Sequence, residues 1–217
     1  MNIKGAIFDL DGTIIDSMLM WEHTMSQFLL SHGLTPSETA DEDVCDLDFN
    51  QTADYVIKNY MPDKKPHEII DLLDSFVEER YLYHLPLKEG VDSFLISLKQ
   101  MGVRLIIATA SNRHLVEGAL KRHGLLHLFD DIVTCQQVGL GKHISPLVFE
   151  VALEKIGTKK SETLIFEDAL YAVKTAKRAG FSVVGIYDEY SRKNREQMKK
   201  LCDFYFDTWK EAEEALI

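Results

Sequence analysis

Short runs of β-branched and other apolar residues alternate with helix-length segments from residue 90 to the end of this 217-residue chain. The expected strands lie at 103–108, 132–134, 163–166, 183–186 and 204–206. The expected helices lie near 91–101, 113–123, 146–156, 169–179 and 191–200. Alternation of this kind is typical of a parallel sheet with helices on both faces, so we expect a Rossmann-like α/β core.

A block without a convincing strand separates the first expected strand, Ala6-Ile7-Phe8, from the rest of the sheet. Helical spacing begins after Ser17, the expected N-cap, continues to Gly33, and returns around 50–60 and over 67–83. We therefore predict an inserted all-helical cap domain. The expected domains are an α/β core at 1–15 and 86–217 and a cap at 16–85, with hinges near 14–17 and 84–88.

The charge balance limits the partners that this chain can bind. It has 24 Lys and Arg residues and 35 Asp and Glu residues, which gives a formal net charge of -11. A field of this sign repels a nucleic-acid backbone and an anionic membrane surface. We expect neither partner, and we expect a phosphate site to need cations placed locally.

The cysteines and the apolar runs indicate the cellular setting. Cys45, Cys135 and Cys202 lack the paired spacing of a zinc site or redox motif, so we expect free thiols in a reducing compartment. Lys4, Asp9 and Asp11 interrupt any leader-like run, and no apolar stretch approaches the roughly 20 residues of a membrane span. The expectation is a cytoplasmic protein, monomeric by default.

Polar residues follow the expected strands at their carboxyl ends, where ligands gather in an open parallel sheet. These residues are Asp9 and Asp11 after the first strand, Thr109, Ser111 and Asn112 after the second, Lys142 near the third crossover, and Glu167 and Asp168 after the fourth. Carboxylates crowded into one crevice repel each other, and a hard divalent cation neutralises them. Oxygen ligands favour Mg²⁺ over zinc or copper. The set also offers a nucleophile, cations and a proton donor, as phosphoryl transfer requires.

The segment Asp9-Leu10-Asp11-Gly12-Thr13 resembles the signature of the haloacid dehalogenase-like superfamily. Thr109 at a strand end, Gly141-Lys142, and Phe166-Glu167-Asp168 are similar to the other three motifs of that superfamily, in their usual order. The resemblance spans nearly the whole chain. The helical insertion is similar to the cap of the β-phosphoglucomutase-like branch.

This resemblance implies roles for individual residues. Asp9 would attack phosphorus to form an aspartyl-phosphate, and Asp11 would protonate the leaving group and then activate water. Mg²⁺ would be held by the carboxylates of Asp9 and Asp168, by the backbone carbonyl of Asp11, and by Glu167 either directly or through water. Thr109 and Lys142 would bind the transferring phosphoryl oxygens. The stretch Ala110, Ser111 and Asn112 would contact the substrate.

Each of these residues also has an ordinary structural explanation. Asp9 and Asp11 are typical of a capped turn after a strand, and Lys142 of a solvated surface position. Asp168 is a possible helix N-cap, as are Ser111 and Asn112 for the helix near 113–123. The chain also departs from the family pattern, because His143 follows Lys142 where many relatives have proline, and Pro146 is displaced by one residue.

The cap sequence favours one reaction over another. The stretch from about Val44 to Thr52 is acidic and contains no arginine, which disfavours binding of a second phosphate. We therefore expect a Mg²⁺-dependent phosphatase acting on a small phosphate monoester, such as a sugar phosphate or a nucleotide-like metabolite. The alternatives are a β-phosphoglucomutase-like sugar-phosphate mutase and a non-catalytic phosphate-binding regulator.

Overall fold

The computed structural model describes residues 3–44, 47 and 49–217. The acidic stretch of the predicted cap is only partly covered, because Cys45, Asp46 and Asp48 lie outside the described residues. The chain divides into two compact units, one formed by residues up to Ser17 together with Leu85–Ile217, and the other by Met18–His84. In the part of the chain that the structure describes, no helix combines the length and apolarity that a membrane span needs.

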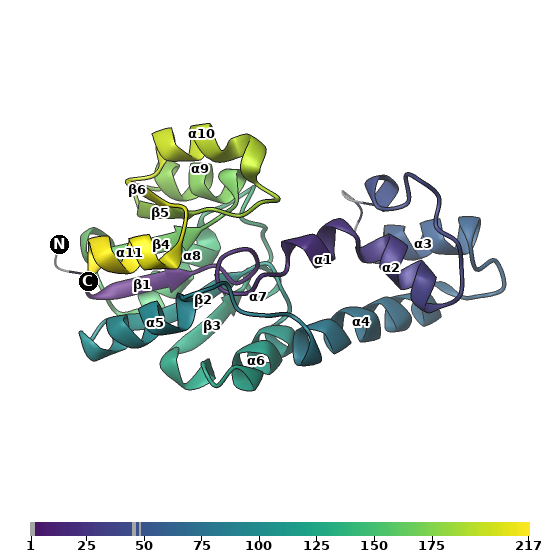
Figure 1. Ribbon diagram of the computed structural model, residues 1–217, viewed down its shortest axis with the longest axis horizontal. Helices are drawn as coiled ribbons and strands as arrows, with labels where there is room; N and C mark the ends of the chain where they lie inside the picture. Colours follow the sequence, from purple (N-terminus) through teal and green to yellow (C-terminus); the bar gives the residue numbers. More distant parts are fainter. Residues whose placement is uncertain (1–2, 45–46, 48) are drawn as a thin grey trace. The chain divides into compact units, whose positions relative to one another are not determined.

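A six-stranded parallel sheet forms the centre of the first unit (Figure 1). Its strands are β1 (Gly5–Phe8), β2 (Arg104–Thr109), β3 (Asp131–Thr134), β4 (Thr163–Glu167), β5 (Ser182–Ile186) and β6 (Phe204–Phe206), in the order β3-β2-β1-β4-β5-β6. The buried strand β1 pairs with β2 on one side and β4 on the other, with Phe8 opposite Ile107 and Phe166. The predicted Rossmann-like α/β class is confirmed. In this strand order, the chain reverses direction across the sheet between β1 and β4, which is where ligands bind in such folds.

Helices cover both faces of this sheet. They are α5 (Val91–Gln100), α6 (Arg113–Arg122), α7 (Cys135–Val138), α8 (Leu147–Ile156), α9 (Leu170–Arg178), α10 (Arg195–Leu201) and α11 (Trp209–Leu216), with short 3₁₀ helices η2 (Leu126–Leu128), η3 (Lys160–Glu162) and η4 (Arg192–Asn194). Alternate strand residues point to opposite faces. Ile7 and Ile165 therefore pack with α8, α9 and α10, whereas the Phe8 and Phe166 rings pack with Phe94 and Trp209 from α5 and α11.

Helix α11 was not predicted. The residue that could have indicated the start of this helix is Thr208, whose hydroxyl accepts a hydrogen bond from the Glu211 N–H at 3.2 Å and so caps the helix. Trp209 is buried, and its indole N–H donates to the Thr13 carbonyl at 3.1 Å. The last helix of the chain thus holds the loop that follows β1.

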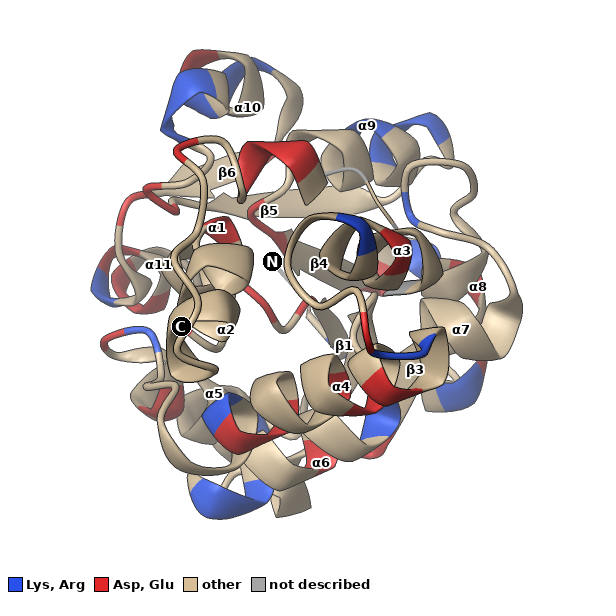
Figure 2. Ribbon diagram, turned by 90° about the vertical axis from the view of Figure 1, so that its right-hand side faces the viewer, with Lys and Arg blue, Asp and Glu red and all other residues tan. Residues whose placement is uncertain are grey.

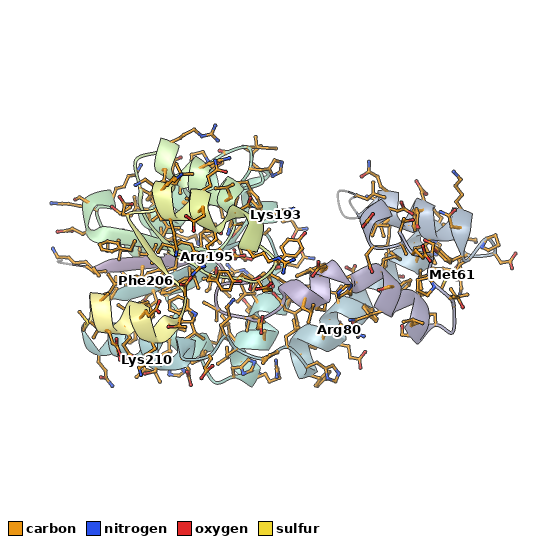
Figure 3. All side chains as sticks on the ribbon, turned by 45° about the horizontal axis from the view of Figure 1, so that its top comes forward. Met61, Arg80, Lys193, Arg195, Phe206 and Lys210 are labelled. Atoms are coloured by element: carbon orange, nitrogen blue, oxygen red, sulfur yellow. The ribbon has the colours of Figure 1, made fainter. Side chains whose placement is uncertain are left out.

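The last strand is fixed to its neighbouring helix by an ion pair. Arg195 of α10 donates to both carboxylate oxygens of Asp207, which directly follows β6, and Figure 3 labels Arg195 and Phe206. Figure 2 shows basic residues on α9 and α10, as well as on other helices of the chain. Only four of the 24 Lys and Arg residues lie in 18–84, against 14 of the 35 acidic residues.

The second unit is helical. It contains α1 (Met18–Glu22), α2 (Thr24–Ser31), η1 (Glu42–Val44), α3 (Phe49–Asn59) and α4 (Pro66–Tyr83). The single helix expected after Ser17 is wrong, because the chain breaks at His23, where the Thr24 hydroxyl bonds back to the Met20 carbonyl at 2.8 Å. Within the unit, the Trp21 indole N–H donates to the Tyr81 hydroxyl at 3.0 Å and joins α1 to α4.

Candidate active site

Three carboxylates meet where β1 and β4 end. Asp9 follows β1, Glu167 is the last residue of β4, and Asp168 comes next. One carboxylate oxygen from each lies within 4.8 Å of the others, and all three residues are buried. The backbone N–H of Asp9 donates to the Phe166 carbonyl at 3.0 Å, so the sheet pairing itself brings these side chains together.

The loop after β1 is folded tightly. The Leu10 carbonyl accepts hydrogen bonds from the N–H groups of Thr13, Ile14 and Ile15. Gly12 has φ of 75°, a left-handed conformation that glycine adopts without strain. The Thr13 hydroxyl donates to Asp168 at 3.3 Å and so links this loop to the end of β4.

Lys142 lies inside the carboxylate cluster. It is buried, and its Nζ donates to Asp9 Oδ1 and, at 2.6 Å, to Glu167 Oε1. The displaced Pro146 does not turn Lys142 away. Pro146 is instead the N-cap residue of α8. The turn before it is held by hydrogen bonds from the N–H groups of Ile144 and Ser145 to the Gly141 carbonyl.

Burial and mutual repulsion shift the acid–base properties of the cluster. Burial raises the pKa of Asp9 to about 8, with Lys142 opposing and Glu167 and Asp11 adding to the shift. Burial, followed by the charges of Glu167 and Asp9, also raises the pKa of Asp168. Burial disfavours the charged form of Lys142, but Asp9 and Glu167 outweigh it and raise its pKa above the usual range. Lys142 therefore stays positively charged, and it can offset only one of the three negative charges that the cluster carries when all its carboxylates are ionised.

The second aspartate of the signature is held by two hydroxyl groups. Ser17 donates to Asp11 Oδ1 and Ser111 donates to Asp11 Oδ2, each at 2.6 Å. Ser17 was expected to cap a helix, and its hydroxyl makes this bond instead. The buried Thr109 hydroxyl accepts from the Ser111 N–H at 3.0 Å, so the end of β2 joins the same network.

The remaining predicted site residues occupy different surroundings. Ala110 is exposed, and Asn112 is the N-cap residue of α6 without a side-chain capping bond. Their contact with substrate stays a prediction. The capping alternative for Asp168 is wrong, because Ala169 holds the N-cap position of α9.

Sequence reasoning missed a buried ion pair beside the cluster. Asp188, two residues beyond β5, is 4% exposed and accepts from Lys88 Nζ at 2.7 Å. Lys88 also donates to the Tyr187 carbonyl at 2.9 Å. The charge of Asp188 contributes to the raised pKa of Asp168, after burial, Glu167 and Asp9. The strand-end rule used for the first four strands would have found Asp188 after the fifth.

Replacing Asp188 by alanine is expected to lower the free energy of unfolding by roughly 2–3 kcal/mol, because Lys88 is left largely buried without its carboxylate. Urea denaturation at pH 7 measures the change. The double variant Lys88→Met/Asp188→Leu removes both charges and is expected to recover most of the loss. A double variant as unstable as Asp188→Ala would contradict this account of the pair.

Known proteins resemble this chain over most of its length. A family model described as haloacid dehalogenase-like hydrolase matches residues 6–186. Validoxylamine A 7'-phosphate phosphatase from Streptomyces hygroscopicus subsp. limoneus is 29% identical over 186 residues, which cover 84% of this chain and 85% of that protein. Fructose-1-phosphate phosphatase YqaB from Escherichia coli is 27% identical over 188 residues, 84% of this chain and 95% of that protein.

The fold has counterparts among solved structures. A Thermotoga maritima protein described as a β-phosphoglucomutase superposes with a TM-score of 0.82 at 19% identity, covering 99% of this chain and 98% of the other. At this identity the likeness concerns the fold alone.

Proposed function

This chain belongs to the haloacid dehalogenase-like hydrolases, and we propose that it is a Mg²⁺-dependent phosphatase that hydrolyses a small phosphate monoester through an aspartyl-phosphate on Asp9. The family and hydrolase class predicted from the four motifs are thereby confirmed. The observation that carries the proposal is the buried cluster of Asp9, Glu167 and Asp168 around Lys142, at the point where strand order reverses. We propose that Met18–His84 is the cap that covers this site during the reaction.

The donor set suits a hard divalent cation. Asp9, Glu167 and Asp168 offer three carboxylates in one small buried volume, and Lys142 offsets a single negative charge. A cation with oxygen ligands stabilises such an excess of negative charge. Bound there, Mg²⁺ would neutralise these carboxylates and the phosphoryl oxygens during transfer.

The chain's own residues account for the two steps. Asp9 forms a bond to phosphorus while the bond between phosphorus and the alcohol oxygen breaks, and Asp11 gives its proton to that oxygen. Asp11 then removes a proton from water, which attacks phosphorus and releases inorganic phosphate from Asp9. The hydrogen bonds from Ser17 and Ser111 support this role, because they fix the Asp11 carboxylate before the substrate arrives.

Lys142 and Thr109 would stabilise the phosphoryl oxygens. Lys142 keeps its charge in the cluster, and Thr109 is buried at the end of β2, the strand that pairs with β1. Groups held in place before the reaction stabilise developing charge without reorganising.

The charge of residues 18–84 supports a substrate with one phosphate. Fourteen acidic and four basic residues in this segment repel a second phosphate group. The name of one reported relative, fructose-1-phosphate phosphatase, supports a phosphorylated sugar as substrate. Hydrolysis is therefore favoured over a mutase reaction, which must retain a bisphosphate.

A substrate panel tests the proposal. Purified protein with Mg²⁺ is mixed with sugar phosphates, a sugar bisphosphate and nucleoside monophosphates, and released phosphate is measured with and without a chelator. We expect release from one or more monoesters, lost on chelation, with the bisphosphate a poorer substrate. No release from any ester would refute the proposal, and conversion of a sugar 1-phosphate to its 6-phosphate without net hydrolysis would establish the mutase instead.

A further inference from the structure

The groups of the active site lie below the surface, whereas two aromatic side chains next to them reach solvent. Asp9, Lys142 and Asp168 are each at most 6% exposed. Tyr171 is 51% exposed, and His143, which directly follows Lys142, is also exposed. Because the active-site groups are buried, the alcohol part of an ester whose phosphoryl group is bound at Asp9 extends toward the surface.

Tyr171 is placed by the same turn that carries the carboxylates. It lies in the first turn of α9, three residues after Asp168. Its phenol is close enough to respond to the cluster, since partial burial and then the charge of Glu167 raise its pKa, with Lys142 opposing. The position of Tyr171 is thus fixed relative to the phosphoryl site by a regular helix.

The His143 ring packs against the Tyr171 ring. The two rings meet edge to face, with centroids 6.3 Å apart and planes at 81°, a favoured geometry for aromatic pairs. The imidazole also folds over Gly141, where a Cβ atom would lie 2.7 Å from the ring carbon Cε1. Gly141 therefore leaves the room that this ring position needs.

We propose that His143 and Tyr171 form an aromatic wall that contacts the leaving alcohol and favours phosphate esters of cyclic sugars over those of open-chain polyols. The inference rests on the proposed phosphatase function. A sugar ring presents a flat face of C–H groups that can pack against an aromatic ring. Aromatic side chains line many ligand sites. An open-chain polyol covers less of that surface and loses more conformational freedom when it is bound.

Steady-state kinetics with a matched pair of substrates tests the wall. Glucose 6-phosphate and sorbitol 6-phosphate have the same number of carbons and the same phosphate position, and differ in the ring. The wild type is expected to prefer the ring, with kcat/KM higher by about fivefold or more. Tyr171→Ala and His143→Ala should each raise KM for glucose 6-phosphate by about fivefold, leave its kcat within about twofold, and change KM for sorbitol 6-phosphate by less than about twofold.

Two further variants separate ring contact from other effects. Tyr171→Phe keeps the ring and should keep the preference. His127→Ala removes another exposed histidine. His127 lies in η2, before β3, and therefore at the amino ends of the strands, away from the active site. This variant should leave the kinetics with both substrates unchanged. Equal melting temperatures for all variants would show that the fold is retained.

The outcomes distinguish this inference from the proposed function. If the wild type hydrolyses both esters equally, or if Tyr171→Ala lowers activity toward both alike, the aromatic wall is refuted while the phosphatase stands. If no ester of the substrate panel is hydrolysed, the proposed function fails and the inference fails with it.

Discussion

The Asp9→Asn variant is expected to release phosphate at least about 10⁴-fold more slowly than the wild type, because it lacks the carboxylate that attacks phosphorus. The fold should persist. Asparagine has the same shape as aspartate, and burial already disfavours the charged form of Asp9 by raising its pKa to about 8. The measurement is phosphate release under saturating substrate, with circular dichroism to check the fold.

Asp16→Asn is the matched control for this variant. Asp16 is exposed near the end of the same loop, so its loss of charge should leave the rate within about twofold of wild type. A variant at Asp9 that kept a tenth of the wild-type rate or more would contradict the assignment of the nucleophile.

The Lys142→Met variant is expected to lose both activity and stability. Removing this cation leaves Asp9 and Glu167 buried beside Asp168 without their positive partner, which costs about 3–5 kcal/mol of unfolding free energy near neutral pH. The rate should fall by about 10²–10³-fold, since a positive charge near the phosphoryl oxygens is lost. Lys121→Met, at an exposed position on α6, is the control and should change neither quantity.

The dependence of stability on pH distinguishes this explanation from simple loss of packing. Burial raises the pKa of Asp9 to about 8 and raises that of Asp168, so the folded protein holds protons that the unfolded chain releases above about pH 4. Unfolding free energy without Mg²⁺ should therefore fall as pH rises through this window. Lys142→Met should make this fall steeper. The loss of unfolding free energy relative to the wild type, measured by urea titration, should therefore be larger at pH 8 than at pH 5. An equal deficit at both values would contradict the electrostatic explanation.

The sheet could be predicted from the sequence because its strands are buried on both faces. Such strands are continuous apolar runs, and the runs that end at Phe8, Ala108 and Phe166 are followed at once by polar residues. The position of Asp9 beside Asp168 then follows from parallel strands sharing one edge. Strand positions and the carboxylate cluster were available from local pattern, whereas the break at His23 and helix α11 were not predicted.

The pairing of the missed residues depends on contacts between distant parts of the chain. Lys88 and Asp188 pair across 100 residues, and Trp209 bonds to Thr13 across 196. No local sequence pattern indicates which residues form these two pairs. Ser17 looked like a helix cap because its neighbours are helical, but the carboxylate of Asp11 competes for its hydroxyl.

Trapping the covalent intermediate tests the central claim most directly. The Asp11→Asn variant lacks both the proton donor of the first step and the base of the second, but an ester such as p-nitrophenyl phosphate has a leaving group that needs no proton, so its first step should run ahead of the second. After incubation with Mg²⁺ and this ester, acid quenching and peptide mass spectrometry should find a phosphoryl group on Asp9, absent in the Asp9→Asn/Asp11→Asn double variant. A phosphoryl group on a different residue, or hydrolysis that continues in the double variant, would contradict the account.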